Sequence, residues 1–228
     1  MGRSGEDIVS TFATFLLHNR DARLVTLYLD NCAGQNKQWA LFSALVYLVN
    51  SEMIQAEKIT LKYLVSGHTH MSADSAHSCF KDALLRRSPI CDFDDYVNAV
   101  GSSRIPVKVM QPTDFKVWPN GVSQYQLNQL EDRPLFRDIS SAEFRRGSTS
   151  FFLGRNGGKR KEFRVLKKNF DNMTAPNQKS QRGVNAKKKT EIIEKLLPLM
   201  PSTRRAFWHD LRECKVPDLC SLKLPDLD

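Results

Sequence analysis

Residues 24–87 constrain the fold of this chain more than any other stretch. Two runs within it have the composition of β-strands, Leu24–Leu29 and Lys58–Val65, and a helical pattern follows each of them. Asn36–Ser51 is apolar almost all round, which predicts a deeply packed helix, and Ala73–Arg87 predicts a second helix that stops before a Ser-Pro pair. Strand, helix, strand, helix is an α/β order, and a right-handed crossover makes the two strands parallel.

The two strand patterns predict different degrees of solvent exposure. Leu24–Leu29 is a nearly continuous apolar run, which is typical of a strand buried on both faces. In Lys58–Val65 apolar residues alternate with Lys58, Thr60 and Lys62, so one face of this strand is expected to be wetter. A helix is expected before the first strand, over residues 5–19, because apolar side chains recur there at helical spacing.

Four consecutive segments are expected along the chain: an α/β core over 1–90, a small mixed α+β extension over 91–168, a disordered polar linker over 169–189 and a helical end over 190–228. The extension is predicted to hold a helix at Phe93–Val100, short strands at Ile105–Val109 and Phe115–Trp118, and a hairpin of Ala142–Leu153 with Glu162–Lys167. The helical end is predicted as Thr190–Leu199 and Thr203–Cys214, divided by Pro201.

Positive charge is concentrated in one segment. The net charge is +9, and residues 154–189 hold 12 basic and 2 acidic residues, whereas residues 1–153 hold 16 of each. A local excess favours a polyanion, DNA above all, as partner. A solvated loop and a nuclear-import signal are the alternatives. The candidate phosphate contacts are Lys159, Arg160, Lys161, Lys167, Lys168, Lys187, Lys188 and Lys189, and the interleaved rings that can stack on bases are Phe151, Phe152, Phe163 and Phe170.

Several classes of protein are disfavoured by composition. No apolar run approaches the length of about 18 residues that spans a membrane, and the first residues lack the pattern of a secretory signal. The five cysteines are odd in number and irregularly spaced, which indicates reduced thiols in an intracellular protein rather than a disulfide framework or a zinc site. The lysine-rich segment favours the nucleus over the cytoplasm.

Asp30 is the first candidate for a functional side chain. It follows a predicted strand directly, and Asn31 and several small residues come next, which allows a sharp turn. In open α/β sheets, ligands bind beyond the carboxyl ends of the strands. The alternative is that Asp30 caps the next helix or stabilises a turn.

Residues 67–77 bring together three histidines, His68, His70 and His77, and the carboxylate of Asp74. Asp74 lies at the start of a predicted helix, where the helix dipole stabilises the anion that a hard divalent cation needs, and His77 shares its helix face. A helix cap and ordinary surface histidines are the alternatives. A zinc hydrolase is disfavoured because the spacing to Asp74 does not fit and no second histidine cluster supplies further ligands.

Three blocks resemble a group of transposon-derived animal proteins of unknown function, whose shared domain is similar to the RNase H-like core of DDE transposases and integrases. The blocks are Asp30-Asn31-Cys32-Ala33-Gly34-Gln35-Asn36-Lys37, then Gly67-His68-Thr69-His70-Met71 with Asp74 and His77, and Leu196-Leu197-Pro198-Leu199-Met200-Pro201 with Phe207-Trp208. The resemblance implies Mg²⁺- or Mn²⁺-dependent phosphodiester cleavage or strand transfer. Asp30 and Asp74 would hold the metal, and His70 or His77 would position water or phosphate.

On that template Asp30 and Asp74 take the roles of the second and third acids. The three-stranded meander and the first acid would then precede Met1, which leaves a partial core of two parallel strands with an open edge for a second copy or another chain. We therefore expect no turnover from this chain alone. A substitute acid from Asp92, Asp94 or Asp95 is one alternative, and the other is a non-enzymatic module that binds nucleic acid or protein through residues 154–189.

Overall fold

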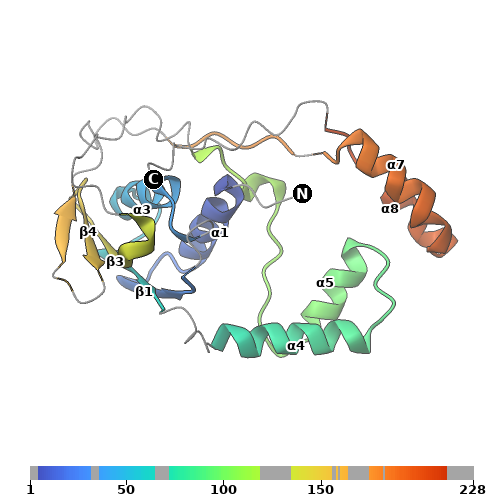
Figure 1. The fold of residues 1–228 in the computed structure, drawn as a ribbon, viewed down its shortest axis with the longest axis horizontal. Helices are drawn as coiled ribbons and strands as arrows, with labels where there is room; N and C mark the ends of the chain where they lie inside the picture. The colour runs from blue at the N-terminus through green and yellow to red at the C-terminus, as the bar shows by residue number, and fades with distance from the viewer. Residues whose placement is uncertain are drawn as a thin grey trace. The chain divides into compact units, whose positions relative to one another are not determined.

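The computed structural model of the chain describes residues 5–31, 36–64, 72–118, 135–155, 158, 160–163, 175–181 and 183–214. It has a mixed α/β fold with a five-stranded mixed sheet and, within the described residues, six α-helices (Figure 1). The chain divides into two compact units that are each discontinuous in sequence. Unit 1 comprises residues 1–69, 110–179 and 220–228, and unit 2 comprises residues 70–109 and 180–219.

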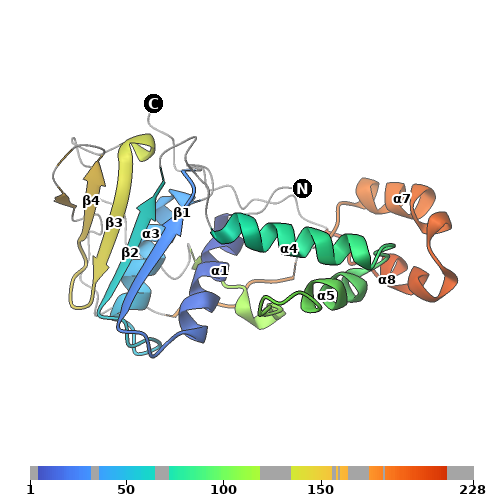
Figure 2. The same cartoon turned by 90° about the horizontal axis from the view of Figure 1, so that it is seen from below.

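Unit 1 is built on a sheet with the strand order β1-β2-β3-β4-β5 (Figure 2). The first two strands, β1 (Leu24–Leu29) and β2 (Lys58–Tyr63), are parallel, which confirms the prediction. The other three are antiparallel to their neighbours: β3 (Ile139–Arg145), β4 (Phe151–Arg155) and β5 (Lys161–Phe163). The sheet is therefore larger than the expected pair of strands, because the segment after residue 138 extends it from β2.

The predicted hairpin of Ala142–Leu153 with Glu162–Lys167 is confirmed in part, because β4 pairs antiparallel with β5. Its first arm is wrong, since it is divided between β3 and β4, and residues 164–167 lie outside the described residues. The turn between β3 and β4 contains Gly147, whose φ of +79° lies in the region that side chains disfavour. Asn50, the last residue of the helix Trp39–Asn50, holds this turn. Its side chain accepts a hydrogen bond from the Gly147 amide at 2.6 Å and donates one to the Ser148 carbonyl at 3.0 Å.

The core of unit 1 lies between the sheet and two helices, α1 (Gly5–His18) and α3 (Trp39–Asn50), on one face of the sheet (Figures 1 and 2). Every residue of α3 from Leu41 to Val49 is at most 7% exposed, which confirms the prediction of a deeply packed helix. Phe42 contacts the rings of Trp39, Phe136, Phe144 and Phe151, with centroid distances from 5.5 to 6.3 Å. Aromatic packing thus joins α3 to β3 and β4.

The prediction that β1 is buried on both faces is wrong, because only one face of β1 packs against the core. Val25, Leu27 and Leu29 pack against the core, whereas Leu24 and Tyr28 on the opposite face are 67% and 57% exposed. A continuous apolar run does not record what lies over the second face of a strand. Among the described residues β1 pairs with β2 alone.

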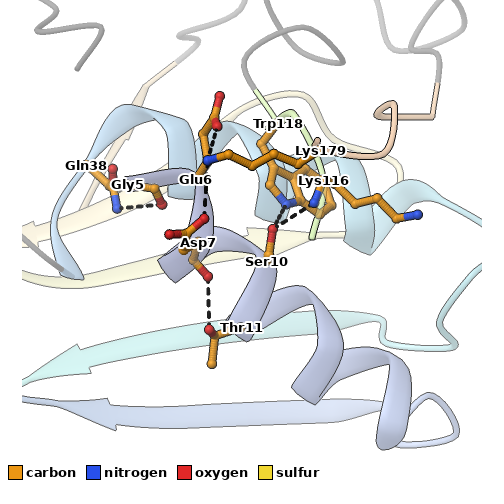
Figure 3. A network of polar contacts seen from close by, with 9 residues as sticks. All are labelled: Gly5, Glu6, Asp7, Ser10, Thr11, Gln38, Lys116, Trp118 and Lys179. Carbon is orange, nitrogen blue, oxygen red and sulfur yellow. Dashed lines mark hydrogen bonds and ion pairs between the residues drawn. The ribbon is translucent and has the colours of Figure 1, made fainter. Parts of the chain in front are cut away.

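A polar network at the start of α1 joins three segments of unit 1 (Figure 3). The Lys179 ammonium lies 2.6 Å from a Glu6 carboxylate oxygen and 3.2 Å from one of Asp7. The buried Ser10 hydroxyl accepts hydrogen bonds from the Lys116 amide and the Trp118 indole, both at 3.1 Å. The first turns of α1 thus fix residues 116–118 and Lys179, which are distant in sequence.

Unit 2 is helical in the residues that the structure describes. Its helices are α4 (Ser72–Arg86), α5 (Phe93–Gly101), α7 (Ala186–Lys195) and α8 (Arg205–His209), with short 3₁₀ turns at Leu197–Leu199 and Ser202–Arg204. The helices predicted over residues 73–87 and 93–100 are confirmed. The predicted helix over residues 203–214 is shorter, since α8 ends at His209.

The described part of the predicted disordered linker, residues 169–189, is hydrogen-bonded. Lys116 forms an antiparallel bridge with Gln178, and Val184 forms a parallel bridge with Glu213. Helix α7 begins at Ala186, four residues before the predicted start, because the Asn185 side chain caps it by accepting a hydrogen bond from the Lys187 amide. Residues 105–109 do not form the predicted strand, and residues 115–118 contribute only the bridge at Lys116.

No helix in the described ranges is long and apolar enough to cross a membrane. Among the described residues, Cys79, Cys91 and Cys214 are not joined in disulfides.

Candidate functional site

The predicted metal ligand Asp30 lies directly after β1 and belongs to a group of hydrogen-bonded residues that we call the clamp: Asp30, Asn31, Asn36, Lys37 and Tyr63. Its carboxylate accepts a hydrogen bond from the Asn36 side chain, and the side-chain oxygen of the neighbouring Asn31 accepts one from the Lys37 ammonium. Tyr63, the last residue of β2, donates a hydrogen bond from its hydroxyl to the Asn36 carbonyl at 2.8 Å. The carboxyl ends of both parallel strands therefore hold residues 36 and 37, which is the position that the sequence predicts for a site.

Lys37 is the member of this clamp that the sequence patterns did not indicate. Its side chain is 1% exposed, and its ammonium lies 4.6 Å from the centre of the Tyr63 ring. Burial lowers the pKa of Lys37, although the negative charge of Asp138 offsets part of this effect. The signal available in the sequence was its place at the end of the Asp30–Lys37 block.

Asp74 and His77 belong to α4 of unit 2. Asp74 lies in the first turn of the helix and is exposed, as a helix-start carboxylate is expected to be. His77 lines an open pocket of about 630 Å³ between α4 and the residues around α5, with the lining residues His77, Phe80, Lys81, Leu84, Leu85, Ser88, Ile90 and Tyr96. The lining residues are mainly apolar and include no Asp or Glu, so they do not supply the carboxylate oxygens that a divalent cation prefers.

The predicted catalytic residues are distributed over both units. Asp30 lies in unit 1, Asp74 and His77 lie in unit 2, and His70 lies outside the described residues. Within the described part of the chain, no three His, Cys, Asp or Glu side chains form a group that could hold a metal ion. The convergence of Asp30 with Asp74 stays a prediction.

Two of the three alternative acids, Asp92 and Asp95, have a structural role in unit 2. Asp92 caps α5 by accepting a hydrogen bond from the Asp95 amide at 2.8 Å. Both carboxylates pair with Arg204, at 3.2 Å for Asp92 and 2.8 Å for Asp95. These contacts tie α5 to the segment before α8, and the Trp208 indole adds a hydrogen bond to the Cys91 carbonyl at 2.8 Å.

The predicted phosphate contacts also fall into both units. Arg160 and Lys161 are exposed at the start of β5 in unit 1, and Lys187, Lys188 and Lys189 occupy the first turns of α7 in unit 2. Lys188 and Lys189 have carboxylate partners, Glu191 at 3.6 Å and Glu213 at 3.5 Å. Lys159, Lys167 and Lys168 lie outside the described residues.

Only part of the predicted set of stacking rings can meet a ligand. Phe151 and Phe163 are 1% and 5% exposed because they face the core, so the prediction that they stack on bases is wrong. Phe152 points to the opposite face of the sheet, since side chains alternate along β4. Phe170 lies outside the described residues.

The face of the sheet opposite α1 and α3 carries charged groups that the sequence patterns did not single out. Glu143 on β3 is 3% exposed and binds two arginines, Arg145 at 2.6 Å and Arg160 at 2.8 Å. Burial alone would raise the pKa of Glu143, but the hydrogen bond from Arg145 and the charges of Arg145, Arg160 and Lys58 hold this pKa below its usual value. The signal for this surface in the sequence was the polar alternation of Lys58, Thr60 and Lys62 along β2.

A family model described as a domain of unknown function, DUF7869, matches residues 8–135. No curated protein and no solved structure matches the chain.

Proposed function

The chain belongs to the DUF7869 family, and we propose that it binds nucleic acid on a fold derived from RNase H-like transposases and integrases. The order of elements supports the proposed ancestry. Helix α1, the parallel strands β1 and β2 with α3 between them, and helix α4 follow one another as the second half of that core does. Asp30 lies at the carboxyl end of β1, where the resemblance places an acid.

The observation that carries the proposed binding is the segregation of charge. Residues 154–189 contain 12 basic and 2 acidic residues in a chain that is otherwise close to neutral. The side chains of Arg160 and Lys188 are 50% and 62% exposed, so their charges can reach a phosphate backbone. The ion pair of Lys188 with Glu191 is not an obstacle, because exposed ion pairs are worth little and exchange readily for phosphate.

The test is the salt dependence of binding to a labelled DNA duplex of generic sequence. We expect the affinity to fall steeply with salt, and the triple substitution of Lys187, Lys188 and Lys189 by Gln to reduce the slope by roughly one for each phosphate that is no longer neutralised. Lys81→Gln on α4 is the matched control, because it removes an exposed charge of unit 2 outside the basic segment. An unchanged slope in the triple variant contradicts a role for α7.

The second candidate function is metal-dependent cleavage or joining of phosphodiester bonds, and the position of Asp30 after a parallel strand favours it. The carboxylate oxygens of Asp30 and Asp74 are hard donors that fit Mg²⁺ or Mn²⁺, which would polarise the phosphate and activate water. The resemblance assigns two of the three acids to residues of this chain. DNA nicking by the purified protein in Mn²⁺ that is lost in Asp30→Asn would support this second function, and nicking that Asp30→Asn leaves unchanged would reject a role for Asp30.

We also propose a nuclear location, on the basis of the lysines of the basic segment. A fluorescent fusion of the chain is expected to concentrate in nuclei. The Lys187–Lys189 triple variant is expected to spread through the cell, and equal nuclear concentration of both proteins would reject these lysines as the signal.

A further inference from the structure

We propose that the sheet face opposite α1 and α3 is a binding platform for single-stranded nucleic acid, which we call the outer face. It consists of the outward side chains of β1 to β5 and Arg160: Leu24, Thr26, Tyr28, Lys58, Thr60, Lys62, Ser141, Glu143, Arg145, Phe152, Glu162 and Arg160. The proposal deepens the proposed function, because it names a surface and a class of nucleic acid.

Two aromatic rings on the outer face are placed for stacking. Tyr28 on β1 is 57% exposed, and Phe152 lies on β4, three strands away. Three inter-strand steps of about 4.8 Å separate their strands by roughly 14 Å, which accommodates more than one nucleotide of an extended strand between them. Rings that project from a sheet stack on unpaired bases independently of sequence, because every base has a π-face.

A cation lies over each ring, so a base would stack on the opposite side of that ring. The Lys62 ammonium lies 5.3 Å from the centre of the Tyr28 ring and 3.4 Å from its hydroxyl, and the Arg145 guanidinium lies 4.6 Å from the centre of the Phe152 ring. A base on the ring would thus bring its phosphate next to a positive charge. The guanidinium plane of Arg145 is itself a stacking surface for a base.

The charge of the outer face is complementary to a polyanion. Lys58, Lys62, Arg145 and Arg160 are its cations, and Glu143 and Glu162 are its carboxylates. Glu143 is buried and binds both arginines, so its negative charge holds their guanidinium groups in place and offsets one of their two positive charges. The exposed surface therefore presents positive charge with one exposed carboxylate, Glu162, beside Phe152.

A single strand fits these features better than a duplex or an acidic protein. In a duplex the base faces are stacked on one another, so Tyr28 and Phe152 would have no ring to contact. An acidic peptide would use the cations but would gain little from two separated rings. The outer face thus predicts a preference for unpaired bases, in contrast to the basic segment, which contacts phosphates of either form.

The experiment is a titration of the full chain into a fluorescent 20-nucleotide thymidine strand and a 20-base-pair duplex, followed by anisotropy. Tyr28→Ala and Lys62→Ala are the probes, since both side chains are exposed and neither binds Glu143. Each is expected to weaken single-strand binding, Tyr28→Ala by about fivefold or more, and to leave duplex binding nearly unchanged. Phe15→Ala is the matched control, because it removes a half-exposed ring from α1, outside the outer face.

The outcomes separate this proposal from the proposed function. If the Lys187–Lys189 variant weakens binding but both probes bind the single strand like the natural chain, the outer face is rejected and the basic segment stands. If Tyr28→Ala and Lys62→Ala weaken single-strand and duplex binding equally, the surface is only a site for polyanions and the proposal fails. The proposal also fails if polyglutamate competes for the natural chain as well as an unlabelled thymidine strand does. If no form of nucleic acid binds, both proposals fail.

Discussion

The contacts that stabilise unit 1 internally differ from those that stabilise unit 2. The large apolar cluster lies in unit 1, where Phe42, Leu45, Phe144 and Phe151 are at most 1% exposed. The buried apolar residues described in unit 2 are mostly small: Ala83, Cys91, Ala99, Val100 and Leu197. Unit 2 relies instead on polar contacts, such as Arg204 with Asp92 and Asp95.

This difference predicts where each unit tolerates change. An apolar cluster loses both transfer free energy and packing when a side chain is shortened. A unit held by half-exposed polar interactions loses less free energy for each one removed, and it is expected to open locally before the whole chain unfolds. Substitutions in unit 1 should thus change global stability, and those in unit 2 should change local opening.

The largest effect is expected from Phe42→Ala, because Phe42 is fully buried and touches four other rings. We expect a loss of about 3–5 kcal/mol in the free energy of unfolding, measured by urea denaturation. Leu199→Ala in unit 2 is the control, since Leu199 is 78% exposed and should change this free energy by less than about 0.5 kcal/mol. Equal losses would remove the distinction between the units.

Lys179→Met is expected to cost about 3 kcal/mol, because it leaves the buried Glu6 carboxylate without this cation. Burial alone lowers the pKa of Lys179, but the hydrogen bonds and charges of Glu6 and Asp7 raise it above its usual value. The stabilisation is thus complete below the pKa of the unfolded lysine and is lost as pH rises through the higher folded pKa. Lys116→Met is the control, since the network uses only the Lys116 amide.

The difference in the free energy of unfolding between the natural chain and Lys179→Met is expected to shrink as pH rises through the folded pKa of Lys179. A constant difference would show that packing, rather than charge, accounts for the effect of the substitution. The measurement is urea denaturation of both proteins at neutral pH and at the highest pH at which the natural chain remains folded.

Glu143→Gln is expected to cost about 1–3 kcal/mol at neutral pH, because the two arginines lose a charged acceptor. The pKa of Glu143 is lowered in the folded chain, so this stabilisation is present above the pKa of the unfolded carboxyl and is lost as pH falls through the folded value. Acid titration followed by tryptophan fluorescence should show the natural chain and the variant converging at low pH. Parallel titration curves would show that the effect of Glu143→Gln does not depend on the charge of this carboxylate.

The smallest effect is expected from Arg204→Ala in unit 2, at about 1–2 kcal/mol, because the guanidinium is 42% exposed and solvent screens its two ion pairs. Amide hydrogen exchange should become faster in α5 and α8, with little change in β2 and β3. Arg104→Ala, another exposed arginine of unit 2, is the control. Faster exchange in the sheet would contradict independent opening of unit 2.

Local patterns in the sequence predicted the central elements of unit 1 correctly. The apolar periodicity of residues 36–51 identified α3, and the crossover rule gave parallel pairing of β1 with β2. The alternation at Lys58, Thr60 and Lys62 identified a polar face of β2. These features depend on neighbouring residues, so a single sequence contains them.

For the candidate site, the sequence correctly placed Asp30 at the end of a strand and Asp74 at the start of a helix. It did not indicate Lys37 or Glu143, because burial of a charged side chain depends on partners such as Tyr63 and Arg160 that are distant in sequence.

What the sequence by itself determined is the α/β core of two strands and their helices, and the segregation of positive charge into residues 154–189. Only the tertiary structure decided that β1 is an edge strand, that Phe152 faces outward while Phe151 faces the core, and that both units are assembled from distant segments. The reason is that alternation along a strand defines two faces but does not record which segments cover them or which strands pair at its edges. That information arises only when α1 and α3 pack on one face of the sheet and β3 pairs beside β2.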